Sequence, residues 1–317
     1  MLTVLFATRN RAALLRKVLD TFCELQSPNS GWKLVVVDNA STDGTSHVLA
    51  SFRSRLPLQI VLEPTVGKNH ALNAGLQVVE GDLTVLTDDD VFPRADWLVQ
   101  LRKAAETHPD YSIFGGAIVP RWEIPPPPWL QWIDLGPIFT ITPEWIKEGE
   151  LPPAHVTLVQ GPNMAIRTII FRSGVRFDPF IGPSGSSYAM GSETEILLRL
   201  SRLGHRAWHV QNAVVAHFIR EEQVNQGWIL QRAVRYGRGW CRMAPNSKLW
   251  LGIPRHLFRD IPKQAARIVV AWALSRPDSL FRARWRLNYL RGEAIEAHVL
   301  ARQRRTTAHL DLSIGEP

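Results

Sequence analysis

The first half of the chain alternates short apolar runs with longer segments in which apolar residues recur at helical spacing. A short, continuous apolar run is typical of a strand that is buried on both faces of a sheet. The predicted strands are residues 2–7, 33–37, 58–62 and 83–86. The predicted helices that follow them are residues 12–25, 45–52, 70–79 and 94–106. This alternation predicts an α/β fold with a doubly wound, mainly parallel, Rossmann-like sheet flanked by helices.

The second half of the chain has a less regular pattern. Residues 120–155 form a Pro- and Trp-rich insertion, which we expect to be a long loop or lid over the edge of the sheet. The other predicted elements are a helix over residues 164–171, a Gly- and Ser-rich loop over 178–190, an amphipathic helix over 193–203 and a short strand over 213–216. The last strand ends at His217.

Basic charge is concentrated near the C-terminus. The whole chain has a net charge of +8, and residues 232–305 hold 17 Lys and Arg against 4 Asp and Glu. Such asymmetry usually indicates an anionic partner, either membrane phosphates or nucleic acid. Four basic residues at four-residue spacing lie along one stripe of a predicted helix: Arg255, Arg259, Lys263 and Arg267. We expect residues 221–305 to form a basic helical segment that lies on a membrane surface or packs on the catalytic part, with residues 306–317 as a tail.

Composition narrows the class of protein. Apolar residues make up 45% of the chain and charged residues 21%, which is the balance of a globular protein. The two cysteines, Cys23 and Cys241, exclude a disulfide scaffold and a zinc site built on paired cysteines, and they suit a reducing compartment. The apolar run at residues 268–274 is far shorter than the ~20 residues of a membrane-spanning helix. No secretory signal is expected, because the basic residues follow the first apolar run.

Polar residues directly follow three of the predicted strands. Thr8 follows the first strand, Asp38 the second, and Asp88, Asp89 and Asp90 the fourth. Ligands of such sheets bind beyond the carboxyl ends of the strands, so these residues should face one crevice. Three crowded carboxylates repel one another unless a cation neutralises them. Because Mg²⁺ and Mn²⁺ bind carboxylates together with substrate phosphates, we expect a metal–diphosphate site; a helix start capped by Asp90 is the alternative.

Four further residues are candidates for the same site. Asp38 could accept a hydrogen bond from a nucleoside base or ribose, or it could close a turn. Lys68 lies in a loop near the strand ends and could pair with a diphosphate. Glu193 could be a general base for an acceptor hydroxyl, while Glu195 better fits compensation of a helix dipole. His217 could complete a metal shell, or it could be a structural histidine.

Six segments, taken in order, resemble family 2 inverting glycosyltransferases with the GT-A fold. These segments are residues 7–11, 35–45, 73–76, 86–90, 161–165 and 191–200. The resemblance covers residues 1–220 and implies a nucleotide-sugar-binding and catalytic domain over that range. It implies that Glu193 is the catalytic base and that a divalent cation, Mn²⁺ or Mg²⁺, binds the diphosphate of the donor.

The resemblance also implies roles for the other candidates. The predicted donor-binding residues are Thr8, Asp38, Lys68, Asp88 and Asp89; the resemblance implies all of these except Lys68, which its position near the strand ends adds. The predicted metal ligands are Asp90, Asp89 and His217, of which the resemblance implies the two aspartates and the strand end adds His217. Two departures from the family pattern concern these roles. The base of the family is usually the Asp of a Glu-Asp pair, where this chain has Ser192-Glu193, and Thr87 could occupy the first position of the Asp-x-Asp motif.

These features predict a metal-dependent inverting glycosyltransferase. It would move one sugar from a nucleoside-diphosphate sugar, with a UDP-sugar favoured, to a hydroxyl of a sugar or lipid-linked acceptor in polysaccharide or glycolipid assembly. The Gln-x-x-Arg-Trp signature of processive synthases is not clearly present, which favours single-sugar transfer. The alternatives are a nucleotidyltransferase and a non-enzymatic basic protein that binds membranes or nucleic acid. We do not expect nucleic acid as a partner, because the acidic strand ends would repel it. The anionic partner should then be a membrane surface, and we expect a cytoplasmic protein that is peripheral on the inner face of the membrane.

Overall fold

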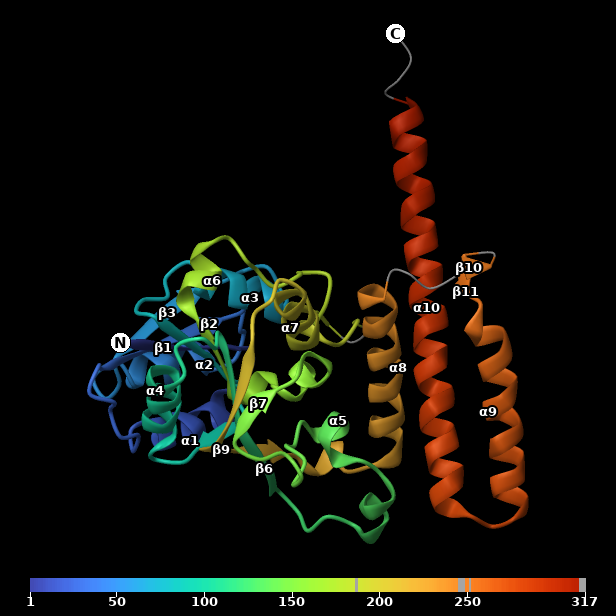
Figure 1. Cartoon of the computed structure of the whole chain (residues 1–317), viewed down its shortest axis with the longest axis horizontal. Helices are drawn as coiled ribbons and strands as arrows, with labels where there is room; N and C mark the ends of the chain where they lie inside the picture. Colours follow the sequence, from blue (N-terminus) through green and yellow to red (C-terminus); the bar gives the residue numbers. More distant parts are fainter. Residues whose placement is uncertain (186–187, 245–248, 251, 314–317) are drawn as a thin grey trace. The chain divides into compact units, whose positions relative to one another are not determined.

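The chain divides into two compact units. The computed structural model describes residues 1–185, 188–244, 249–250 and 252–313 (Figure 1). The first unit comprises residues 1–125, 135–179 and 192–221. The second comprises residues 126–134, 180–191 and 222–317. The last boundary lies close to the predicted one at residue 220, and two short segments from earlier in the chain group with the C-terminal helices.

A single mixed sheet forms the centre of the first unit. In the described part of the chain its strand order is β3-β2-β1-β4-β8-β6-β9-β5, and β7 pairs with β9. The strands are β1 (Leu2–Thr8), β2 (Trp32–Asp38), β3 (Leu58–Leu62), β4 (Leu83–Leu86), β5 (Val91–Pro93), β6 (Ile113–Trp122), β7 (Gly149–Leu151), β8 (Met164–Arg167) and β9 (Ala207–Ile219). The four predicted strands, β1 to β4, are mutually parallel as expected. Strand β8 is antiparallel to β4 and β6, and β6 is parallel to β9.

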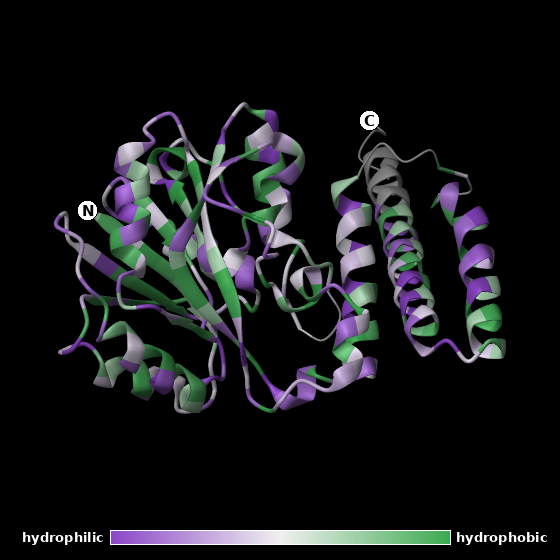
Figure 2. Cartoon of the chain, turned by 60° about the horizontal axis from the view of Figure 1, so that its bottom comes forward, coloured by the Kyte–Doolittle hydropathy of each residue, from purple (hydrophilic) through white to green (hydrophobic). Residues whose placement is uncertain are grey.

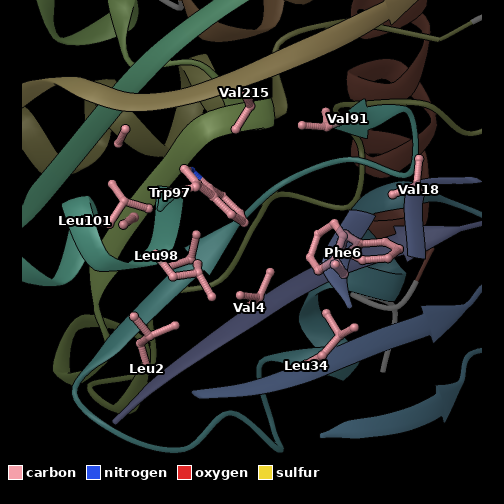
Figure 3. Packing of buried hydrophobic residues seen from close by; sticks show 14 of the residues in the cluster. Leu2, Val4, Phe6, Val18, Leu34, Val91, Trp97, Leu98, Leu101 and Val215 are labelled. Carbon is pink, nitrogen blue, oxygen red and sulfur yellow. The ribbon is translucent and has the colours of Figure 1, made fainter. Parts of the chain in front are cut away.

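Helices cover both faces of this sheet because alternate side chains of its strands are buried on opposite sides. The helices are α1 (Ala12–Phe22), α2 (Thr45–Ser51), α3 (Lys68–Gly75), α4 (Trp97–Thr107), α5 (Leu135–Phe139), α6 (Thr168–Arg172) and α7 (Ser192–Arg202). On one face, Val4 and Phe6 of β1 pack with Trp97 of α4 (Figure 3). On the other face, Leu5 of β1 belongs to a cluster that includes Leu197 of α7. The strands are accordingly the most hydrophobic part of this unit (Figure 2).

One prediction of secondary structure is wrong, and another is correct but too short. Residues 164–171 do not form one helix, because β8 occupies residues 164–167 and α6 begins at Thr168. A short apolar run cannot be assigned to strand or helix by periodicity alone, and pairing with β4 and β6 decides the matter here. The predicted strand at residues 213–216 is part of the much longer β9.

The predicted loop or lid at residues 120–155 contains regular structure. It holds the end of β6, the 3₁₀ helix η1 (Pro128–Trp132), α5 and β7. Three more 3₁₀ helices are η2 (Pro153–Leu158), η3 (Gly161–Asn163) and η4 (Glu221–Gln223). Of these, η3 directly precedes β8 and lies at the candidate site described below.

The second unit is mainly helical. Its elements are α8 (Gln226–Met243), β10 (Leu249–Trp250), β11 (Ile253–Pro254), α9 (His256–Ala273) and α10 (Pro277–Ser313). Helix α10 therefore continues past residue 306, where the tail was expected to begin. Helices α8 and α10 approach closely at Gly292, where a side chain would overlap the carbonyl group of Val234. The fully buried Glu296 of α10 pairs with Arg238 and Arg242 of α8 at 2.7 and 2.5 Å.

Candidate active site

The residues at the strand ends meet at the carboxyl edge of the parallel strands. Thr8 ends β1 and is paired in register with Asp38, which ends β2. Asp88, Asp89 and Asp90 follow β4 and lead into β5, so Asp90 does not cap a helix. The hydroxyl of Thr8 donates a hydrogen bond to Oδ2 of Asp89 at 2.7 Å. The structure thus brings Thr8 and the aspartate cluster together.

Asp38 has partners within its own loop. Its Oδ1 accepts a hydrogen bond from the backbone N–H of Ser41 at 3.2 Å, and its Oδ2 accepts one from the hydroxyl of Ser46. Its side chain is almost fully buried. Asp38 therefore closes the loop after β2, which was the alternative to a nucleotide contact. The nucleotide-binding role of Asp38 stays a prediction.

Each aspartate of the cluster lies beside a different basic group. The pairs are Asp88 with Lys68 at 2.6 Å, Asp89 with Arg11 at 4.0 Å, and Asp90 with His217 at 3.5 Å and Arg220 at 3.7 Å. All three aspartates follow one strand, whereas the four basic groups come from three separate parts of the chain: Arg11, Lys68, and the end of β9 with His217 and Arg220. The fold therefore surrounds the acidic turn with positive charge.

The three carboxyl groups differ in acidity. Burial and the neighbouring Asp90 raise the pKa of Asp89 to about 7, against the smaller opposing effects of Arg11 and Thr8. Burial would also raise the pKa of Asp90, but His217 together with Arg11 and Arg220 outweighs it and lowers the value to about 2. Burial raises the pKa of Asp88, and the charge of Lys68 works against this rise. The repulsion among the three aspartates that the sequence predicts therefore adds to burial in raising the pKa of Asp89 and of Asp88.

His217 has a ring orientation that suits metal binding. It lies on β9 opposite Val91, and its Nδ1–H donates to the carbonyl oxygen of Phe139 at 2.6 Å. This bond turns Nε2 toward Asp90. Burial alone would lower the pKa of His217, but Asp90 raises it above its usual value. A histidine whose other ring nitrogen is held by a backbone carbonyl is a common arrangement in metal sites.

The donor set of this site fits a divalent cation that is also bound by substrate. No three His, Cys, Asp or Glu side chains gather as a complete metal site among the residues that the structure describes. Asp90 and His217 would therefore supply two ligands, and phosphate oxygens would supply others, as is usual for Mg²⁺ and Mn²⁺. The side chain of Asp89 is directed to Thr8 and Arg11. Its predicted role as a metal ligand stays a prediction, like the roles of the other two.

Glu193 lies in the first turn of α7, as predicted, and faces the aspartate cluster. Its Oε1 lies 2.7 Å from Nζ of Lys68. The carboxylate also lies against Gly161 of η3, where a Cβ atom would come within 2.5 Å of Oε1. Glu195 instead pairs with Arg199, one turn further along the helix, at 2.9 Å. The geometry thus favours Glu193 over Glu195 as the carboxylate that serves the site.

Two basic residues of the site were not predicted from the sequence. Arg11 lies three residues after Thr8, inside one of the segments that carry the family resemblance. Arg220 lies three residues after His217, directly after β9. A basic residue in the same strand-end segment as a candidate ligand is the signal that could have identified both. Their positive charges are placed where an anionic diphosphate would need them.

Comparison with known proteins identifies the class to which this fold and site belong. Over 93% of its length the chain is similar to 86% of the structure of a mannosyltransferase from Pyrobaculum calidifontis in complex with GDP-Man and Mn²⁺, with 21% identity and a TM-score of 0.64. It is also similar, over 92% of its length, to 90% of a TarS structure from S. aureus in complex with UDP-GlcNAc, with 16% identity and a TM-score of 0.53. These likenesses confirm the predicted GT-A fold.

Residues 3–173 match the family described as Glycosyl transferase family 2, and the chain belongs to this family. It is 30% identical to a β-monoglucosyldiacylglycerol synthase of Nostoc sp. over 103 residues, which are 31% of this chain and 22% of the relative. It is 23% identical to a glucosyl-dolichyl phosphate glucuronosyltransferase of Haloferax volcanii over 176 residues, or 54% of each chain. The chain thus spans between about a fifth and about half of these relatives. The family confirms the expected glycosyltransferase class and does not support the alternatives.

Proposed function

We propose that this chain transfers one sugar, with inversion, from a nucleoside-diphosphate sugar to an acceptor hydroxyl. The observation that carries the proposal is the meeting of the aspartate cluster, its basic partners and Glu193 at the carboxyl edge of a GT-A sheet. Aspartates beside basic groups suit a metal-bound diphosphate, and a carboxylate close to them suits a base. The match to Glycosyl transferase family 2 supports the same interpretation.

The residues of the site would act in one concerted displacement. Glu193 accepts the proton of the acceptor hydroxyl while the hydroxyl oxygen forms a bond to the anomeric carbon. The bond between that carbon and the diphosphate oxygen breaks on the opposite face, so the configuration inverts and nucleoside diphosphate leaves. A divalent cation held by Asp90 and His217 would neutralise charge on the leaving diphosphate. Arg11 and Arg220 would add fixed positive charge at the same edge.

The metal is Mn²⁺ or Mg²⁺, and the donor is a UDP-sugar in our proposal. The similar structures were solved with GDP-Man and Mn²⁺ in one case and with UDP-GlcNAc in the other, which supports a nucleotide sugar without favouring one base. The names of the two curated relatives refer to a diacylglycerol lipid and a dolichyl phosphate. These names support a lipid-linked acceptor and a place in glycolipid or polysaccharide assembly.

A panel of sugar nucleotides tests the proposed reaction. The full chain is incubated with each donor and with Mn²⁺, Mg²⁺ or EDTA, and released nucleoside diphosphate and pyrophosphate are measured. We expect nucleoside diphosphate, only with a divalent cation, and strong loss of activity in Asp90→Asn. Release of pyrophosphate would instead indicate a nucleotidyltransferase, and full activity in EDTA would refute the metal requirement.

Replacement of the base gives the second test. Glu193→Gln keeps the shape of the side chain but cannot accept a proton, and general-base catalysis contributes roughly 10²–10⁴-fold. We expect turnover to fall by that factor with little change in donor binding. Glu195→Gln is the matched control on the same helix turn and should keep its activity. The reverse result would mean that Glu195 is the base.

We also propose that α9 brings the enzyme to an anionic membrane surface. One line of the helix is buried in the second unit, formed by Leu257, Gln264 and Ala271. The rest of the helix has two exposed flanks. The apolar flank consists of Phe258, Val269 and Trp272, which are 46%, 63% and 71% exposed. The basic flank consists of Arg259, Lys263 and Arg267, which are also exposed.

This arrangement suits a helix that lies in the plane of the headgroups. The apolar flank can enter the boundary with the acyl chains while the basic flank meets lipid phosphates. The C-terminal turns of α9 are its most hydrophobic part (Figure 2). None of the helices that the structure describes is long and apolar enough to span a bilayer. Peripheral binding at the inner face of the membrane would bring a lipid-linked acceptor to the enzyme.

Vesicle sedimentation tests this proposal with the full chain. Replacing the three basic-flank residues by Gln should weaken binding to anionic vesicles about 100-fold, since each basic residue contributes ~1 kcal/mol. Replacing the apolar flank by Ser should weaken binding to anionic vesicles at high salt as well. The control replaces three exposed basic residues of the first unit by Gln: Lys17, Arg53 and Lys103. Equal losses in the control and the basic-flank variant would refute a role for α9.

A further inference from the structure

Lys68 lies at the point where the donor-binding aspartates and the proposed base meet. Its Nζ is 2.6 Å from Oδ1 of Asp88 and 2.7 Å from Oε1 of Glu193. Lys68 begins α3, Asp88 follows β4 and Glu193 belongs to α7, so one ammonium group joins three separate elements. The three side chains are between 20% and 24% exposed. Solvent therefore screens these ion pairs less than it would screen pairs on an open surface.

Lys68 stays protonated in this position. Burial alone would lower the pKa of the lysine, but Asp88 and Glu193 outweigh this effect and raise the pKa above its usual value. The ammonium group can therefore donate to both carboxylates over the whole physiological pH range. The two hydrogen bonds fix the direction of each carboxylate as well as its distance from the lysine.

The carboxylate of Glu193 is also confined from another direction. It lies against Gly161, and a Cβ atom at that position would come within 2.5 Å of Oε1 and 2.7 Å of the next two carbons of the side chain. Such contacts are far shorter than van der Waals distance. Glycine at this position thus leaves the space that the carboxylate occupies. The lysine and the backbone of η3 together restrict where the carboxylate can lie.

We propose that Lys68 is a positioning residue that sets the place of the base relative to the donor-binding aspartates. The inference rests on the proposed function and adds to it. From the sequence, Lys68 was expected to contact the diphosphate of the donor. The geometry assigns it a role on the acceptor side, through Glu193, with Asp88 as the second anchor.

Lys68→Met tests this role, because methionine keeps an unbranched side chain and removes the charge. We expect kcat to fall about 10²-fold, which is the loss that a displacement of about 1 Å can cause. The KM for the donor, and the affinity for nucleoside diphosphate measured by calorimetry, should change little. Lys33→Met is the matched control. Lys33 forms an ion pair with Glu80 that is also 2.6 Å long, and this pair lies outside the site. The kcat of this control should equal that of the wild type.

Gly161→Ala displaces the same carboxylate without removing a charge. It should also lower kcat, and the double variant should lose less than the two single losses combined, because both changes act on the position of Glu193. Thermal unfolding of each variant establishes that it is folded. If Lys68→Met does not fold, Gly161→Ala tests the confinement of Glu193 alone, and normal turnover in that variant overturns the inference.

Two other results would also overturn the proposal. If nucleoside diphosphate affinity falls by the same factor as kcat/KM in Lys68→Met, the lysine is a donor ligand. If Lys68→Met has normal turnover in an assay where the wild type is active, Lys68 does not position the base. A wild-type chain that transfers no sugar from any donor overturns the proposed function and this inference with it.

Discussion

Asn163 is a buried residue whose replacement should destabilise the first unit strongly. It lies at the end of η3 and is completely buried. Its Nδ2 donates hydrogen bonds to the carbonyl oxygens of Ala117 and Ala213 at 2.9 and 2.8 Å. Its Oδ1 accepts a hydrogen bond from the indole N–H of Trp97 at 2.8 Å. The register between β6 and β9 shifts beside Ala117, so the amide links the two strands where their ladder is irregular.

Asn163→Ala removes all three hydrogen bonds and leaves their partners buried. An unsatisfied buried group costs about 1–3 kcal/mol. Because one side chain serves all three groups, the costs are not fully additive, and we expect a loss of about 3–6 kcal/mol in unfolding free energy. This is a large part of the roughly 5–15 kcal/mol that stabilises a domain. At about 2–4 °C per kcal/mol, Tm should fall by about 6–24 °C.

Thermal and urea unfolding of the full chain measure this loss. Trp97→Phe is the matched comparison, because it keeps an aromatic ring in the same core and removes one of the three hydrogen bonds. It should cost about 1–3 kcal/mol for the unsatisfied Oδ1 of Asn163, in addition to the effect of the smaller ring. A Tm of Asn163→Ala within about 2 °C of the wild type would refute the reasoning, since the smallest loss expected, about 3 kcal/mol, corresponds to a fall of about 6 °C.

Three other changes have expected outcomes. Gly292→Ala should force α8 and α10 apart and cost about 1–3 kcal/mol in urea unfolding, and an unchanged midpoint would contradict the close contact. Glu296→Gln should cost about 3–5 kcal/mol, because it leaves two arginines that are only 13% and 16% exposed without their carboxylate; a neutral result would show that water compensates them. Hydrogen bonds from Arg102 hold the pKa of Asp82 below its usual range. A carboxyl group whose pKa is lowered in the folded state stabilises the fold at pH values above its unfolded-state pKa of about 3.9. The stability advantage of the wild type over Arg102→Met should therefore shrink as the pH falls below about 4. An advantage that stays constant from pH 7 to pH 3 would contradict this prediction.

The parts of the fold that were predicted from the sequence are those determined by local pattern. Strands β1 to β4 are short apolar runs in a parallel sheet, and such runs can be recognised one at a time. The carboxyl ends of parallel strands lie at one edge, so the meeting of Thr8 with the aspartate cluster followed from topology alone. The candidate site could be located in this way before any distance was known.

The parts that were missed depend on contacts between distant segments. Lys68 and Glu193 are 125 positions apart, and nothing in the sequence near either residue indicates their contact. Arg220 joins Asp90 only because β9 brings it beside β5. Asn163 lies in a segment that carries the family resemblance. The structure shows that its side chain links Trp97, Ala117 and Ala213 by hydrogen bonds, which the motif did not indicate. Pairwise contacts of this kind depend on the packed fold, which periodicity does not specify.

The balance of charge at the aspartate cluster gives a physical reason to expect joint binding of metal and donor. Each aspartate already has a basic neighbour in the free protein, and Asp90 is strongly acidic because of His217. A bare diphosphate would bring negative charge next to three carboxyl groups, which Coulomb repulsion opposes. A divalent cation bound to the diphosphate would remove most of that charge, so the complex could enter with little electrostatic cost. In the proposed reaction the same basic neighbours would face the leaving diphosphate as negative charge develops on it, which is when fixed positive charge favours a reaction most.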